Sequence, residues 1–205
     1  MGEISNIQTY AKVTEANYQL ALDRFVNALK AIGLWNEAIA ESMASFKWER
    51  DEVGAVFSTF TAPPDYATQV MDTQVSPYVF ISLLSEEPKG ADYWLAFNLY
   101  IETEELQNYY NGEYYQETYP LIKFLVRAVH KELNQTGVYF TDELQDMEAL
   151  EAFSEKDLSK LWEFDYAIIP NHLAVLYSKP PVTHSIKKHE THIEAWYTQR
   201  WKEPV

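Results

Sequence analysis

The sequence contains no cysteine among its 205 residues. Disulfide bridges, thiolate metal sites and a cysteine nucleophile are therefore excluded. Glycine is also scarce, and the six glycines all lie at least twenty residues apart. A phosphate-binding loop needs clustered glycines so that backbone N–H groups can approach the anion, so the Walker and dinucleotide-binding motifs are both absent. No cofactor is expected.

Long apolar runs are missing as well. None approaches the ~20 residues that a membrane helix requires. The opening stretch MGEISNIQTY lacks the basic segment and apolar run of a signal peptide. We therefore expect a cytoplasmic protein.

Positive charge is in short supply. Lys and Arg total 16 against 31 for Asp and Glu, which gives a formal net charge of -15. Such a chain repels phosphate backbones and anionic lipids, so neither nucleic acid nor a membrane surface is an expected partner. A basic protein or a cationic ligand is compatible with this charge, although an acidic surface that only keeps the chain soluble explains it equally simply. The oligomeric state is left open.

Apolar and aromatic residues, in contrast, are abundant. They make up 47% and 15% of the chain, far more than in a disordered acidic sequence. We therefore expect one globular domain spanning residues 1–205, with the acidic residues on its surface.

Local patterns suggest the fold class. Apolar residues at spacings of three and four predict a long N-terminal helix from Ile7 to Ile32. Alternating patterns predict β-rich runs at Tyr78–Leu84 and Tyr93–Ile101, joined as a hairpin by residues 85–90. Another predicted hairpin joins residues 164–169 to 173–177. Thr118 begins a predicted core helix. The order of these elements favours an α+β fold, with a mainly antiparallel sheet of about five to seven strands and helices on one face.

The stretch QNYYNGEYYQETYP, residues 107–120, carries five tyrosines around one Asn111-Gly112 pair. They are Tyr109, Tyr110, Tyr114, Tyr115 and Tyr119. Asn111-Gly112 could form a type I′ hairpin, or Gly112 could end a short helix that begins at Thr103; the helix is favoured. Five tyrosines cannot all be buried in so short a segment, so the stretch is either a recognition surface or edge packing. We take the first four as candidate partner-binding residues.

An acidic segment follows between Thr141 and Asp157. Its candidate partner-binding residues are Asp142, Glu143, Asp146, Glu148 and Glu151. They form either a docking patch for a basic protein or the solvated face of one or two helices.

Three of the five histidines lie near the C-terminus, and His184, His189 and His192 are candidate metal ligands. The sequence HETH is one residue short of the H-E-x-x-H zinc motif. On a strand, the side chains that would point the same way are those of His184, Glu190, His192 and Glu194, whereas Lys187 and Lys188 would repel a divalent cation. A pH-sensitive surface strip is the alternative.

These observations favour a non-enzymatic protein–protein interaction module of the inhibitor, immunity or adaptor type. One alternative is a small-ligand binder or hydrolase with a Trp/Tyr-lined pocket containing Glu and His, and another is metal binding through the C-terminal histidines. No catalytic residue is assigned, and whether the chain is an enzyme stays open.

Overall fold

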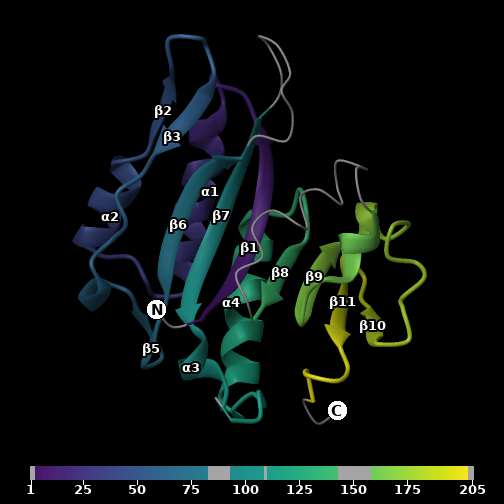
Figure 1. Cartoon of the computed structure of the whole chain (residues 1–205). Coiled ribbons are helices and arrows are strands. Elements are labelled where there is room, and N and C mark those ends of the chain that lie inside the picture. The colour runs from purple at the N-terminus through teal and green to yellow at the C-terminus, as the bar shows by residue number, and fades with distance from the viewer. Residues whose placement is uncertain (1–2, 83–92, 109, 143–157, 203–205) are drawn as a thin grey trace.

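The computed structural model describes residues 3–82, 93–108, 110–142 and 158–202. Its main feature is a seven-stranded antiparallel sheet with the order β10-β11-β9-β8-β1-β7-β6 (Figure 1). The strands are β1 (Ile4–Val13), β6 (Ser76–Ser82), β7 (Tyr93–Glu102), β8 (Val138–Thr141), β9 (Tyr166–Pro170), β10 (His184–Lys188) and β11 (His192–Tyr197). The predicted α+β class and the antiparallel sheet are confirmed.

Four α-helices are described, and two short hairpins stand beside the large sheet. The helices are α1 (Tyr18–Ala31), α2 (Glu37–Ala44), α3 (Thr103–Leu106) and α4 (Thr118–Glu132). The hairpins are β2 (Lys47–Arg50) with β3 (Val56–Thr59), and β4 (Gln69–Val70) with β5 (Thr73–Gln74). Three 3₁₀ turns complete the elements: η1 (Asp65–Ala67), η2 (Leu158–Trp162) and η3 (Asn171–Leu173).

The long helix predicted from Ile7 to Ile32 is wrong, because the first helix begins at Tyr18. Residues Ile4–Val13 form β1, which lies between β7 and β8 in the interior of the sheet. Ile7 and Ala11 suggested a helix because they are four residues apart, but an even spacing also places two side chains on one face of a strand. The spacing alone therefore could not distinguish the two structures.

The main core lies between the sheet and the helix pair α1 and α4, which pack side by side on one face (Figure 1). Phe25 of α1 contacts Phe97 of β7 with ring centroids 4.9 Å apart. From α4, Leu125 and Val129 are buried in the same cluster. The apolar face of α4 therefore covers the middle of the sheet, as its sequence predicted.

The C-terminal part of the sheet differs from its prediction. Residues 173–177 do not pair with β9; instead β9 pairs with β8 and β11. In the register of β9 and β11, Tyr166 lies opposite Trp196 at one end and Pro170 lies opposite His192 at the other. A separate polar cluster occupies each of these two ends.

Candidate functional site

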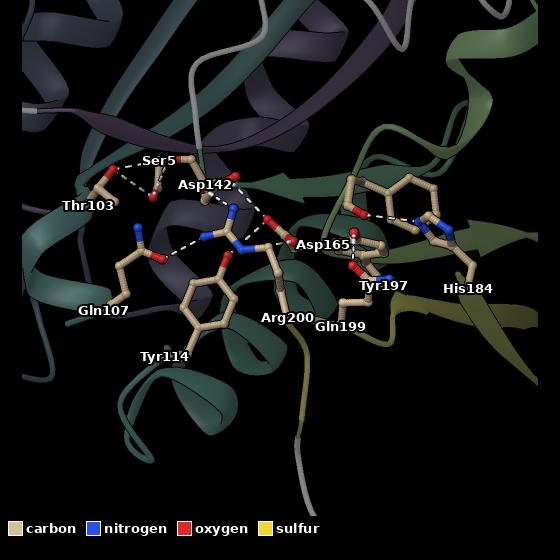
Figure 2. A network of polar contacts seen from close by, with 11 residues as sticks. Ser5, Thr103, Gln107, Tyr114, Asp142, Asp165, His184, Tyr197, Gln199 and Arg200 are labelled. Carbon is tan, nitrogen blue, oxygen red and sulfur yellow. Dashed lines mark hydrogen bonds and ion pairs between the residues drawn. The ribbon is translucent and has the colours of Figure 1, made fainter. Parts of the chain in front are cut away.

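Arg200, just after β11, lies at the centre of the first polar cluster (Figure 2). Its guanidinium forms an ion pair with Asp142, and its Nε lies 3.7 Å from Asp165 Oδ1. Arg200 Nη2 also donates to Gln107 Oε1 at 2.6 Å. Tyr114 completes the group, because its hydroxyl donates to Asp165 Oδ2 at 2.9 Å. We call Arg200, Asp142, Asp165, Gln107 and Tyr114 the Arg200 cluster.

Asp165 is held in place by the backbone on both sides. Its N–H donates to the carbonyl of Phe140 at 2.8 Å, and its own carbonyl accepts from Tyr197 at 3.0 Å. The carboxylate also accepts from the N–H of Asp142 at 3.2 Å. Backbone hydrogen bonds to neighbouring segments therefore hold Asp165 in position.

Burial governs the electrostatics of this cluster. It raises the pKa of Asp165 to about 7, although Arg200 acts in the opposite direction. Burial also raises the pKa of Tyr114, and the negative charge of Asp165 adds to the effect. Burial therefore favours the neutral form of the carboxyl at the base of the site.

A pocket of about 190 Å³ opens beside this cluster. It is lined by Thr141, Asp142, Trp162, Glu163, Phe164, Asp165, His184, Tyr197 and Arg200. The ring of His184 contacts those of Trp162, Phe164 and Tyr197, with centroids 5.2, 5.3 and 5.2 Å away. Aromatic rings therefore form one wall, and three carboxylates and one guanidinium supply the charges. We call this the aromatic–acidic pocket.

His184 is engaged with neutral partners. Its Nδ1 lies 3.0 Å from Thr183 Oγ1 and its Nε2 lies 3.3 Å from the carbonyl of Phe164. Burial lowers its pKa. Both ring nitrogens have partners other than the pocket carboxylates, so His184 and the acids do not form a catalytic dyad.

A larger hollow of about 610 Å³ lies between the end of α1 and the outer face of α4. Its basic lining residues are Lys123, Arg127 and Lys131. Arg127 is paired with Glu194 at 2.7 Å, and Lys123 lies over the ring of Tyr166. Two of these three cations already have partners within the chain. The hollow is therefore poorly suited to bind an anion, although it is larger than the aromatic–acidic pocket.

The structure divides the tyrosine-rich stretch into buried and exposed residues. Tyr110 is 94% exposed and Tyr115 is 42% exposed, whereas Tyr114 is buried in the Arg200 cluster. Tyr119 is buried too, and Tyr109 lies outside the described residues. A short helix does begin at Thr103, as favoured, but it ends at Leu106 and not at Gly112. The type I′ hairpin is wrong: an isolated bridge joins Gln107 to Tyr114, and of Asn111 and Gly112 only Gly112 has a positive φ, of 65°.

Of the acidic candidates, only Asp142 is described, and it lies in the aromatic–acidic pocket. Glu143, Asp146, Glu148 and Glu151 lie outside the described residues.

The three candidate metal ligands separate into two groups. His184 and His189 lie at opposite ends of β10, and His184 belongs to the aromatic–acidic pocket. His189 and His192 are stacked on each other, with ring centroids 4.5 Å apart, at the other end of β9 and β11. Glu194 lies with them.

Sequence reasoning missed Asp165 and Arg200. Neither belongs to a motif, and both lie next to strands that pair only in the folded chain. One signal was available: Asp165 is a lone acid beside the apolar run Tyr166–Pro170, where a charged residue is costly unless it has a partner.

Comparison with known proteins gives no family. No protein-family model matches the sequence, and no curated protein matches it. A search of solved structures finds a similarity to the Pseudomonas aeruginosa T6SS protein PA0821, with a TM-score of 0.35 and 12% identity. That similarity covers 95% of this chain and 64% of the other. A similarity at this level supports no conclusion about function. Among the described residues, no helix is long and apolar enough to cross a membrane.

Proposed function

We propose that this chain is a non-enzymatic binding protein that docks a basic side chain of a protein partner in the aromatic–acidic pocket. The observation that carries this proposal is the combination of an aromatic wall with carboxylates in a pocket of side-chain size. Flat aromatic faces attract cations, at about 0.5–2 kcal/mol for each contact. The exposed carboxylate of Glu163 at the pocket would add a charge-assisted hydrogen bond to a lysine or arginine.

The size of the pocket distinguishes a side chain from a free ligand. Small-molecule sites usually measure roughly 300–1,000 Å³. The pocket beside Asp165 measures about 190 Å³. It therefore suits one long side chain, and the rest of the affinity would come from the surrounding surface.

The charge of the pocket also supports a basic partner. Arg200 is the only cation among the described lining residues, and Asp142 pairs with it directly. Glu163 is exposed at the rim. The net charge of -15 adds long-range attraction, which raises association rates for a basic partner.

Two exposed tyrosines would extend the contact surface. Tyr110 and Tyr115 lie on the loop whose Tyr114 and Gln107 enter the Arg200 cluster. Tyrosine gives a large contact area at low entropic cost, so these side chains are suited to the edge of such an interface. The acids between residues 143 and 151 remain a proposed extension of the same basic-partner interface.

The test is an affinity capture from a lysate of the native host with the untagged protein, at low and high salt, followed by quantitative binding to the recovered partner. We expect a basic protein whose binding weakens at high salt. Glu163→Lys places a cation at the pocket rim and should weaken binding at least tenfold, because like charges at an interface cost several kcal/mol. Tyr110→Ala should weaken it less.

The matched control is Glu41→Lys, which makes the same charge change on the exposed surface of α2. An equal loss in both variants would mean that net charge alone, and not the pocket, governs binding. Unchanged affinity in a Glu163→Lys, Tyr110→Ala double variant would disprove the proposal.

A small-ligand binder or hydrolase is the second candidate, and the pKa of about 7 for Asp165 favours it, since acid–base catalysts work near such values. It ranks second because Asp165 Oδ2 already accepts from Tyr114 and Asp142, and Arg200 lies beside Oδ1.

A further inference from the structure

The turn between β10 and β11 brings two histidines together. The N–H of His189 donates to the carbonyl of His192 at 2.8 Å, which closes the turn. Their rings are stacked with an interplanar angle of 12°. Their side chains therefore present two imidazoles side by side at this turn. Neutral imidazole is the form that binds metals.

Glu194 lies two residues after His192, so both side chains point to the same face of β11. Its Oε2 lies 3.4 Å from Nε2 of His189. Its Oε1 accepts hydrogen bonds from Arg127 at 2.7 Å and from the hydroxyl of Tyr166 at 3.1 Å. One carboxylate oxygen is therefore fixed by outer contacts while the other faces the histidines, as in metal sites whose ligands are oriented by a second layer of hydrogen bonds.

His130, from α4, supplies a possible fourth donor. Its ring centroid lies 5.7 Å from that of His192. Its Nδ1 is buried and has no hydrogen-bond partner among the described residues, and the buried Nε2 of His189 has only the 3.4 Å contact with Glu194 Oε2. Buried nitrogens without partners are uncommon, because each costs free energy. A metal ion would satisfy both.

We propose that His189, His192 and Glu194 form a binding site for a divalent transition-metal ion such as zinc, with His130 as the fourth ligand. One donor atom from each of the first three lies within 4.8 Å of the others. Donor atoms of a tetrahedral zinc site with bonds of about 2.0–2.1 Å are roughly 3.3 Å apart. Small side-chain rotations would close the difference.

The donor atoms limit the choice of ion. Arg127 lies on the outer oxygen of Glu194, and the exposed Lys187 lies opposite Glu194 in the strand register, so these cations repel every divalent ion alike. Calcium and magnesium need several carboxylate or carbonyl oxygens, whereas the proposed site offers one carboxylate. A site with two or three imidazoles and one carboxylate matches the preference of zinc and its neighbours. This site lies at the other end of β9 and β11 from the pocket, and its existence does not depend on the partner proposed above.

The test uses the untagged full-length protein, freed of metal with EDTA and dialysed. Isothermal titration with zinc chloride should give one ion per chain, confirmed by elemental analysis after gel filtration. His189→Ala and His192→Ala should each weaken binding by at least about tenfold, since even outer-layer changes at zinc sites have effects of that size. Cobalt(II) should give the absorption bands of a tetrahedral site in the wild type only.

The matched control is His184→Ala, which removes a histidine from the opposite end of β10 and should leave zinc affinity unchanged. If an alanine variant fails to fold by circular dichroism, Glu194→Gln keeps the side-chain shape and should still weaken zinc binding tenfold. The proposal is overturned if the wild type binds no zinc, or if zinc binding persists in the His189→Ala, His192→Ala double variant.

Discussion

The two polar clusters at opposite ends of β9 and β11 respond to burial in opposite ways. In the Arg200 cluster, burial raises the pKa of Asp165 to about 7. At the histidine end, burial lowers the pKa of His130 to about 4, with help from nearby His192 and His172. Burial favours the neutral form in both cases, which means a protonated acid at one end and a deprotonated base at the other. One sheet therefore carries two titrating groups with opposite effects on stability over the same pH range.

The largest expected effect comes from removing the cation of the Arg200 cluster. Arg200→Met leaves two carboxylates close together and Gln107 without its donor. Breaking a largely buried ion pair from one side should lower the free energy of unfolding by about 3 kcal/mol at pH 7. Urea denaturation of the variant and the wild type measures this change in the free energy of unfolding. Lys202→Met is the control, because its pair with Glu113 is exposed and should contribute under about 1 kcal/mol.

The second prediction concerns the acid. Because the pKa of Asp165 in the folded state is higher than its ordinary value of 3.8, its protonation stabilises the fold most below about pH 4. That contribution is lost as the pH rises toward 7. Asp165→Asn should therefore flatten the pH dependence of stability between these values, measured by urea denaturation at each pH. An unchanged slope would contradict the role of Asp165.

A smaller effect is expected from Arg127→Met, which removes one donor from the buried Glu194 carboxylate while Tyr166 continues to donate. Arg127 is half exposed, so the loss should be about 1 kcal/mol at pH 7. The pKa of Glu194 is lowered because its hydrogen bond and ion pair with Arg127 outweigh burial. The difference between variant and wild type should therefore shrink as the pH falls through the range in which Glu194 becomes protonated. A difference in the free energy of unfolding that does not change with pH would argue against a contribution from the ion pair.

The smallest expected effect is that of His130→Gln. Because the pKa of His130 is lowered, its neutral form stabilises the fold above about pH 6.5, and this contribution is lost as the pH falls toward 4. The variant should reduce the acid sensitivity in that window, opposite in sign to the effect of Asp165→Asn. Thermal unfolding midpoints measured from pH 4 to 7 would show it. The comparison would be refuted if His130→Gln and Asp165→Asn changed the pH dependence of stability in the same direction.

Local patterns predicted the parts of the fold that local sequence determines. The helix from Thr118 and the pairing of β6 with β7 followed from apolar spacing within each segment. The strand β1 was not predicted, because its polar residues resemble the solvent-exposed face of an amphipathic helix. In the structure Asn6 hydrogen-bonds Asn98, 92 residues away. No short window of sequence contains that partner.

The candidate sites show the same limit. His189 and His192 were identified because their spacing is local, and Glu194 could be placed beside them on a strand. His184 belonged to the same run of sequence but lies at the other end of β10. The Arg200 cluster depends on contacts between residues 23 to 93 positions apart in the sequence. Only Tyr114 and Asp142 were found from the sequence, because they belong to the tyrosine-rich and acidic stretches.

The interior position of β1 in the sheet has a consequence for the synthesis of the chain. Its neighbours β7 and β8 lie far downstream, because Asn6 hydrogen-bonds Asn98 of β7, 92 residues away, and pairs with Thr141 of β8. A ribosome adds about 5–20 residues per second, so β1 emerges roughly 5 to 20 seconds before its first partner. During that interval both of its edges are unpaired, which is the state in which nascent strands associate with the wrong chain. Folding should therefore depend on protection of this segment during translation more than on the late C-terminal strands.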